Sequence, residues 1–255
     1  MNYDPINPTS RDNQLKPFDQ LLESTFQIYA RYFGPMVAAA ALGVIPSTLI
    51  SVLWQPEGFL SSVAQLLVTL IPLFVAQASL TVLTWQVIQK RPVEVTAAYA
   101  AALSVAPRYV LLGLVTAVIT GAGVLSLVGI PIALLLSARW AITGPALIIE
   151  QLPVGQALQR SWRLVEGRAL RTLGAVVVTL LGFVFASLIA LVIAGFFGGS
   201  PGVTIVVVSA AQSIVTPLAI IFFFLLYQDY RRITDNAAPA EPPSPPEPPA
   251  RFGQF

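Results

Sequence analysis

The distribution of charge constrains this chain more than any other feature of its sequence. Between Arg171 and Asp229 lie 57 consecutive residues without a charged side chain, and three further uncharged stretches contain 25, 32 and 30 residues. About 20 apolar residues are enough for a helix to cross a hydrocarbon core of about 30 Å. Charged residues make up only 10% of the chain, against roughly 25% in a soluble domain. We therefore expect a multi-pass membrane protein.

One uncharged stretch is too long for one span and is expected to fold back, and the region 109–150 allows two interpretations. The stretch after Arg171 would be roughly 86 Å long as a single helix, and the Gly- and Pro-rich residues 198–202 predict a turn within it. Residues 109–150 can be read as one long span or as a hairpin that turns near 121–131. The hairpin places 13 of the 14 Lys and Arg residues on one side. Because such residues favour the cytoplasm, we select the hairpin.

The predicted fold class is all-α, an integral membrane bundle of six transmembrane helices. Both termini are expected in the cytoplasm of a bacterial cell, and the bundle in its inner membrane. Residues 1–16 are predicted to be a disordered segment, 17–232 the membrane domain, and 233–255 a disordered Pro-rich tail. The predicted spans cover 35–54, 62–88, 109–127, 130–150, 172–197 and 203–227.

A similar segment precedes each pair of spans. Residues 17–33 and 153–168 both have apolar side chains at helical spacing on one face, which is typical of amphipathic helices at a membrane interface. The corresponding segment 92–106 is Ala-rich and less amphipathic. We interpret the chain as a three-fold repeated unit of interface helix, span, turn and span. The alternative is that these are basic loops that merely anchor the spans.

Several motifs resemble those of a bacterial family of multi-pass proteins. They are 157–164 (ALQRSWRL) with Gly167, 216–218 (TPL), 225–231 (LLYQDYR) and 28–34 (IYARYFG). The family is known from the membrane domain fused ahead of the catalytic barrel in some glycerophosphoryl diester phosphodiesterases, and from stand-alone relatives without an assigned function.

The resemblance spans about residues 17–232 and implies a fold and a location in the membrane. It does not imply an activity, because the phosphodiesterase chemistry resides in a soluble barrel that needs catalytic His residues. This chain has no His and no Cys. His-assisted nucleophiles, thiolate catalysis and His- or Cys-ligated zinc are thus excluded. We expect a protein that is not an enzyme and has no cofactor.

Arg139 is the candidate functional residue within the membrane. A charged side chain deep in a bilayer costs about 2.5–3.5 kcal/mol on insertion scales and usually faces the bundle interior or water. One interpretation makes Arg139 a contact for an anion or lipid headgroup, or a gate. The other makes it structural, bonded to Gln77, Gln212, Ser213 or Thr216 or extending to the interface. Our hypothesis, in line with the first interpretation, is that Arg139 faces the bundle interior.

Two carboxylates lie at the ends of predicted spans, near basic segments. Glu150 ends the fourth span and Asp229 the sixth, so ion pairs with arginines of the segment 160–171 are expected. Such pairs usually hold topology rather than do chemistry. Six residues at the inner ends of the spans are predicted as interface anchors: Arg160, Trp162, Arg163, Tyr227, Asp229 and Arg231.

The predicted function is a non-enzymatic scaffold or membrane-homeostasis factor. The alternative is a transporter of small solutes or lipids that uses a cavity at Arg139. The expected partners are the lipid bilayer, anionic lipid headgroups, and either another membrane protein or a second copy of the chain. No nucleic-acid motif is present in the sequence.

Overall fold

The structure is a computed structural model that describes residues 15–124 and 129–237. Within these ranges the chain is helical and contains no strand. The helices are α2 (Phe18–Arg31), α3 (Phe33–Leu53), α4 (Phe59–Ile88), α5 (Val95–Val124), α6 (Gly129–Trp140), α7 (Thr143–Ile149), α8 (Val154–Val165), α9 (Ala169–Phe196) and α10 (Pro201–Ala237). Six segments of the described residues are long and apolar enough to span a membrane, which confirms the predicted fold class.

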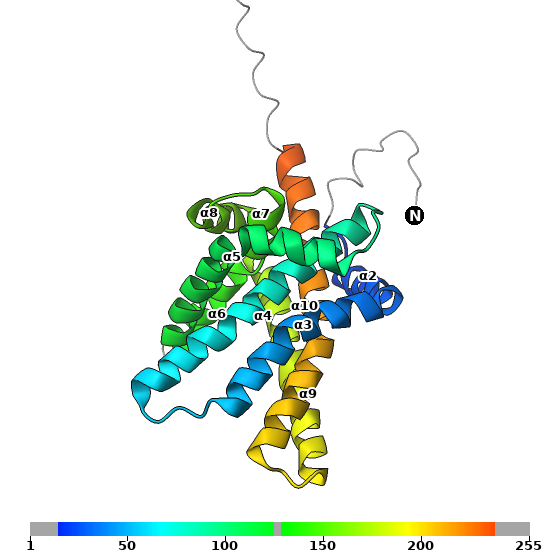
Figure 1. The fold of residues 1–255 in the computed structure, drawn as a ribbon. Helices are drawn as coiled ribbons and strands as arrows, with labels where there is room; N and C mark the ends of the chain where they lie inside the picture. The colour runs from blue at the N-terminus through cyan, green and yellow to red at the C-terminus, as the bar shows by residue number, and fades with distance from the viewer. Residues whose placement is uncertain (1–14, 125–128, 238–255) are drawn as a thin grey trace, which may run out of the picture.

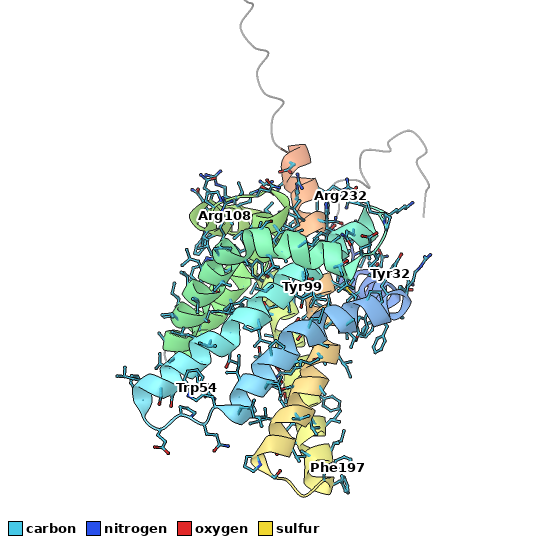
Figure 2. The ribbon with its side chains drawn as sticks, viewed as in Figure 1. Tyr32, Trp54, Tyr99, Arg108, Phe197 and Arg232 are labelled. Carbon is cyan, nitrogen blue, oxygen red and sulfur yellow. The ribbon has the colours of Figure 1, made fainter. Side chains whose placement is uncertain are left out.

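The spans form antiparallel hairpins (Figure 1). Figure 2 shows Arg108 and Arg232 at one end of the bundle, which we call the basic end, and Trp54 and Phe197 at the opposite end. The chain between α9 and α10 turns where Gly198 and Gly199 have φ angles of 90° and 62°. Only glycine adopts such angles without steric cost, so the predicted turn forms where the sequence placed it.

Two of the three expected interface helices are separate elements. Helix α2 buries Leu21, Thr25 and Tyr29 on one face, and α8 likewise buries a face that packs on α6 and α7. The middle segment, 92–106, is not a separate helix, because its Ala-rich residues continue into the third span as α5. In Figure 1, the first part of α5 lies across the end of the bundle before the helix bends. The three-fold repeat therefore stays a prediction.

The predicted fourth span, 130–150, is broken. Helix α6 ends at Trp140 and α7 begins at Thr143. Pro145 explains the break, because a proline has no N–H to bond the carbonyl four residues earlier, here Ala141, and its ring clashes with that carbonyl. The two pieces together still make one span of 21 residues, Gly129–Ile149.

Helix α10 extends beyond the boundary predicted for the membrane domain. The helix continues to Ala237, five residues past 232. Asp235 stabilises this extension, since it pairs with Arg231 one turn earlier at 3.3 Å and with Arg160 of α8 at 2.7 Å. Lys16 also belongs to the packed structure, because its N–H donates to Asp229. The rest of both predicted tails, 1–14 and 238–255, lies outside the described residues.

Candidate functional site

An ion-pair network around Glu150 joins α7, α8 and α10 at the basic end. The Glu150 carboxylate lies 3.1 Å from Nε of Arg160 and 3.9 Å from Nε of Arg231. It also accepts a 2.6 Å hydrogen bond from the hydroxyl of Tyr227. The carboxylate is thus bound to two cations and a neutral donor.

A second cluster surrounds Asp229, whose side chain is only 1% exposed. Its carboxylate pairs with Arg171 of α9 and Arg232 of α10, both at 3.4 Å. The backbone N–H of Lys16 donates to the same carboxylate at 3.2 Å. Asp229 therefore holds the beginnings of α2 and α9 against the end of α10. The ion pairs expected for Glu150 and Asp229 are confirmed.

Arg160 connects the Glu150 cluster to the last turns of α10. Burial by itself would lower the pKa of the Arg160 guanidinium, but its hydrogen bonds to Asp235 and Glu150 outweigh burial and raise the pKa. The group stays charged at any physiological pH. The cation in the link between α8 and α10 is therefore not lost in this pH range.

The six predicted interface anchors do not share one environment. Trp162 is 44% exposed and Arg163 is exposed, so both can reach an interface. Tyr227 is fully buried, and its hydroxyl is bound to Glu150 inside the bundle. Asp229 is likewise buried and belongs to the ion-pair cluster. Sequence position near a span end could not distinguish an outward from an inward side chain.

The structure places Arg139 at the junction of α6 and α8. Its guanidinium carbon lies 4.7 Å from the centre of the Trp162 ring, a cation–π contact. The hydroxyl of Ser161 donates to the carbonyl of Arg139 at 2.7 Å. Arg139 does not line the cavity described next, whose wall begins at its neighbour Trp140. The cavity expected at Arg139 is thus displaced along the same span.

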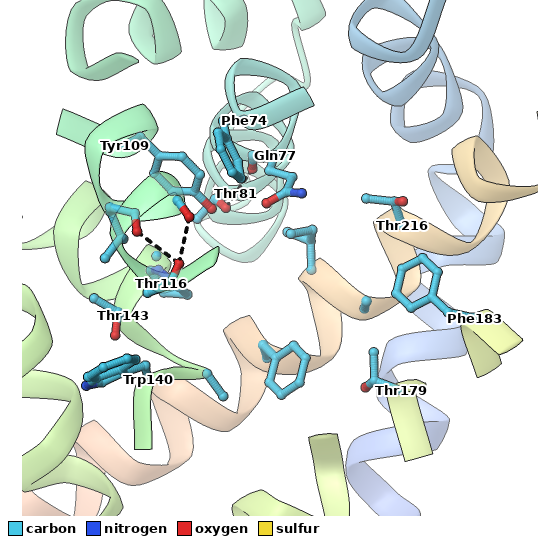
Figure 3. A pocket seen from close by; sticks show the side chains of 18 residues that line it. Phe74, Gln77, Thr81, Tyr109, Thr116, Trp140, Thr143, Thr179, Phe183 and Thr216 are labelled. Atoms are coloured by element: carbon cyan, nitrogen blue, oxygen red, sulfur yellow. Dashed lines mark hydrogen bonds between the residues drawn. The ribbon is translucent and has the colours of Figure 1, made fainter. Parts of the chain in front are cut away.

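A cavity of about 290 Å³, which we call the chamber, lies where α6 and α7 break. Residues 140, 141 and 143–145 of the break form one wall, and α4, α5, α9 and α10 supply the others (Figure 3). Polar uncharged side chains line part of it: Gln77, Thr81, Tyr109, Thr116, Thr143, Thr179 and Thr216. Aliphatic and aromatic side chains form most of the wall, among them Phe74, Trp140 and Phe183. No lining residue is charged.

Two glycines allow the chamber walls to approach closely. A Cβ on Gly113 would lie 2.5 Å from the ring of Phe74, and a Cβ on Gly144 would lie 2.9 Å from the hydroxyl of Tyr109. The Tyr109 hydroxyl interacts with the side chain of Thr81. These contacts connect α4 and α5 to the break, so three consecutive parts of the chain help to set the shape of the chamber.

Thr143 is the most unusual residue of the chamber. The residue is 1% exposed, yet its hydroxyl has no hydrogen-bond partner in the structure. A buried hydroxyl without a partner costs about 1–3 kcal/mol, so such groups usually have a reason. Sequence reasoning missed Thr143. The available signal was Pro145, whose effect on the carbonyl of Ala141 predicts a break here.

The described residues contain no group of three or more His, Cys, Asp or Glu side chains that could hold a metal ion. The fold and these polar features define the chain as a multi-pass helical membrane protein with a partly open chamber that no charged residue lines. Residues 106–236 match the family described as the membrane domain of glycerophosphoryl diester phosphodiesterase, over half of the chain. The chain belongs to this family. No curated protein and no solved structure matched the sequence.

Proposed function

We propose that this chain is a non-enzymatic scaffold of the bacterial inner membrane, with both termini in the cytoplasm and anionic lipid headgroups bound at its basic end. The confinement of Lys and Arg to that end supports the orientation, since such residues favour the cytoplasmic side. The loop residues described at the opposite end, 54–58 and 197–200, include a single charged side chain, that of Glu57.

The observation that carries the proposal is a surface pocket of about 510 Å³ between α2 and the end of α4. Three cations line it, Arg31, Lys90 and Arg91, and its lining includes no acidic residue. Arg31 also lies over the ring of Tyr32, 5.8 Å from its centre. A phosphate of an anionic lipid would supply the missing negative charge, and juxtamembrane cations attract such lipids by about 1 kcal/mol each.

The chemistry of the described residues supports a protein that is not an enzyme. The two carboxylates of the basic-end clusters, Glu150 and Asp229, are each bound by two arginines and serve as structural anions. The chamber has no acid or base on its wall. The enzyme in the family description is a phosphodiesterase, and the matched residues belong to its membrane domain.

Helix α9 offers a broad apolar surface to the membrane, since only 6% of an 18-residue apolar segment within it is buried.

We expect the double variant Lys90→Gln, Arg91→Gln to retain less anionic lipid. The purified protein is supplied with equal amounts of phosphatidylglycerol and phosphatidylcholine, and the bound lipids are measured by native mass spectrometry. The ratio of bound phosphatidylglycerol to bound phosphatidylcholine should be several-fold lower for the variant than for the wild type. The charge-matched control is Arg108→Gln, Arg163→Gln, because both arginines are exposed and lie outside the pocket. An equal loss in the control contradicts a specific lipid site. Hydrolysis of a phospholipid or glycerophosphodiester by the purified chain contradicts the non-enzymatic proposal.

Transport is the second candidate function, and the break between α6 and α7 favours it, because broken helices line the sites of many transporters. The candidate site is then the chamber and not Arg139. Cysteine labelling separates the two functions, since the native chain has no Cys. For a scaffold we expect Thr143→Cys to resist a membrane-impermeant maleimide from both sides of the membrane.

Two exposed positions serve as controls for this labelling. Gln55→Cys, in the loop after α3, should react from outside the cell, and Ser104→Cys, near the bend of α5, only in inverted vesicles. Reaction of both controls from the same side contradicts the proposed orientation. Reaction of Thr143→Cys from either side favours a transporter, because the reagent must then enter the chamber through water.

A further inference from the structure

The chamber is suited to an uncharged ligand. Its wall carries hydroxyl, amide and phenol groups and no Asp, Glu, Lys or Arg. An unpaired charge buried in such surroundings is costly, whereas an uncharged polar group is stabilised if it finds hydrogen bonds. In Figure 3, Gln77 extends toward the space between Thr81 and Thr216. Polar groups from different helices therefore converge on one small volume.

The threonines of the chamber differ in the hydrogen bonds that they can still make to a ligand. The hydroxyls of Thr81 and Thr179 each donate to the carbonyl four residues earlier in their own helix, at 2.9 Å. Their oxygens remain available only as acceptors. The Thr143 hydroxyl has no partner, although the residue is 99% buried and lines the chamber. The hydroxyl oxygen is itself buried, so the Thr143 side chain must rotate toward the chamber before it can donate one hydrogen bond to a ligand and accept another.

An apolar groove adjoins the chamber. The groove has a volume of about 160 Å³ and lies between α2, α9 and α10. Thr179 and Ala219 line both the chamber and the groove, so the two spaces meet at these residues. The groove wall is almost entirely apolar, with Leu22, Phe26 and Phe222 among its residues. A chamber with several polar groups beside an almost wholly apolar groove matches a ligand with a small polar head and a hydrocarbon chain.

We propose that the chamber binds the uncharged, hydroxyl-bearing head of a neutral lipid such as a diacylglycerol, with an acyl chain in the groove and the head bonded to Thr143. The size agrees, because a chamber of about 290 Å³ is near the lower limit of about 300 Å³ for small-molecule sites. This site is separate from the cationic surface pocket, so its failure leaves the proposed scaffold function unaffected.

The first test removes the free hydroxyl. Thr143→Val keeps the shape of the side chain, and we expect it to bind 1,2-dioctanoylglycerol about tenfold more weakly than the wild type, as measured by native mass spectrometry. The variant should fold, since it removes an unpaired buried polar group. Thr69→Val is the matched control, because the Thr69 hydroxyl is also buried without a partner but lies outside the chamber. This control should bind the probe normally.

The second test separates the two possible sources of the head, a lipid or a free polyol. We expect free glycerol to bind far more weakly than dioctanoylglycerol, because only the lipid fills the groove. Gly182→Leu should fill the groove and lower dioctanoylglycerol binding, since a Cβ there meets nothing within 4 Å. Gly174→Leu on the same helix is equally open but lines neither space, and it should bind normally.

A third probe tests the charge of the head. Dioctanoyl phosphatidic acid has the same chains and a charged head, so its binding should not depend on Thr143. The proposal is overturned if the wild type does not bind dioctanoylglycerol, if Thr143→Val binds it as the wild type does, or if free glycerol binds equally well. It is also overturned if Thr143→Val weakens phosphatidic acid as much as dioctanoylglycerol.

Discussion

Replacing Asp229 with Asn is expected to lower the free energy of unfolding by about 3 kcal/mol, the largest effect of any conservative change at the basic end. Asn has the same shape, but it leaves Arg171 and Arg232 without their shared anion. The effect lies at the lower end of the range of about 3–5 kcal/mol for broken buried pairs, because the two arginines are 18% and 35% exposed. Unfolding by SDS in mild detergent micelles, followed by circular dichroism, measures it.

Asp235→Asn is the matched control for this variant. Asp235 also pairs with two arginines, but its side chain is 44% exposed. Pairs that water reaches contribute about 1 kcal/mol or less, so this control should stay close to the wild type. Equal stability of the two variants would show that burial of Asp229 does not strengthen its ion pairs, contrary to our account of the basic end.

Replacing Gly43 with Ala is expected to destabilise the bundle by about 1–3 kcal/mol. A Cβ at this position would lie 2.3 Å from Cβ of Ala76 and 2.6 Å from the carbonyl oxygen of Pro72. The carbonyl belongs to the backbone of α4 and cannot rotate away, so α3 and α4 must separate. Their separation also strains the 2.9 Å hydrogen bond from Ser47 to the Thr69 carbonyl. The same SDS unfolding measures the loss.

Gly34→Ala, in contrast to Gly43→Ala, is expected not to destabilise the bundle. A Cβ on Gly34 would meet nothing within 4 Å, so the change keeps all packing and removes a residue that costs about 0.5–1 kcal/mol within a helix. We expect a small gain in stability. If Gly43→Ala is also stabilising, close contact between α3 and α4 does not depend on glycine.

Much of the fold was predictable because each relevant signal is local in the sequence. A charged residue opposes insertion into hydrocarbon wherever it stands, so four uncharged stretches, the glycines at 198–199 and the one-sided distribution of Lys and Arg together predict six spans. Gly198 and Gly199 likewise predict their turn from their own backbone freedom. The ion pairs of Glu150 and Asp229 were predictable as a class, because carboxylates at span ends lie beside a basic segment.

Other features depended on which side chains meet, and the sequence could not specify them. Tyr227 stands near a span end like an interface tyrosine, but the rotation of α10 directs it inward to Glu150. Arg139 stands mid-span, but the position of α8 supplies Trp162 as its contact. The segment 92–106 resembles a separate helix in position, but α5 continues from it into the third span, with Pro107 inside the helix.

The sequence alone determined the class of the protein, its six spans and the end at which its charges gather, because the bilayer acts on each residue separately. The tertiary structure decided the position of the chamber, since five spans that are distant in the sequence must pack together to enclose it. It also decided the environment of Thr143, because a hydroxyl lacks a partner only through the placement of its neighbours.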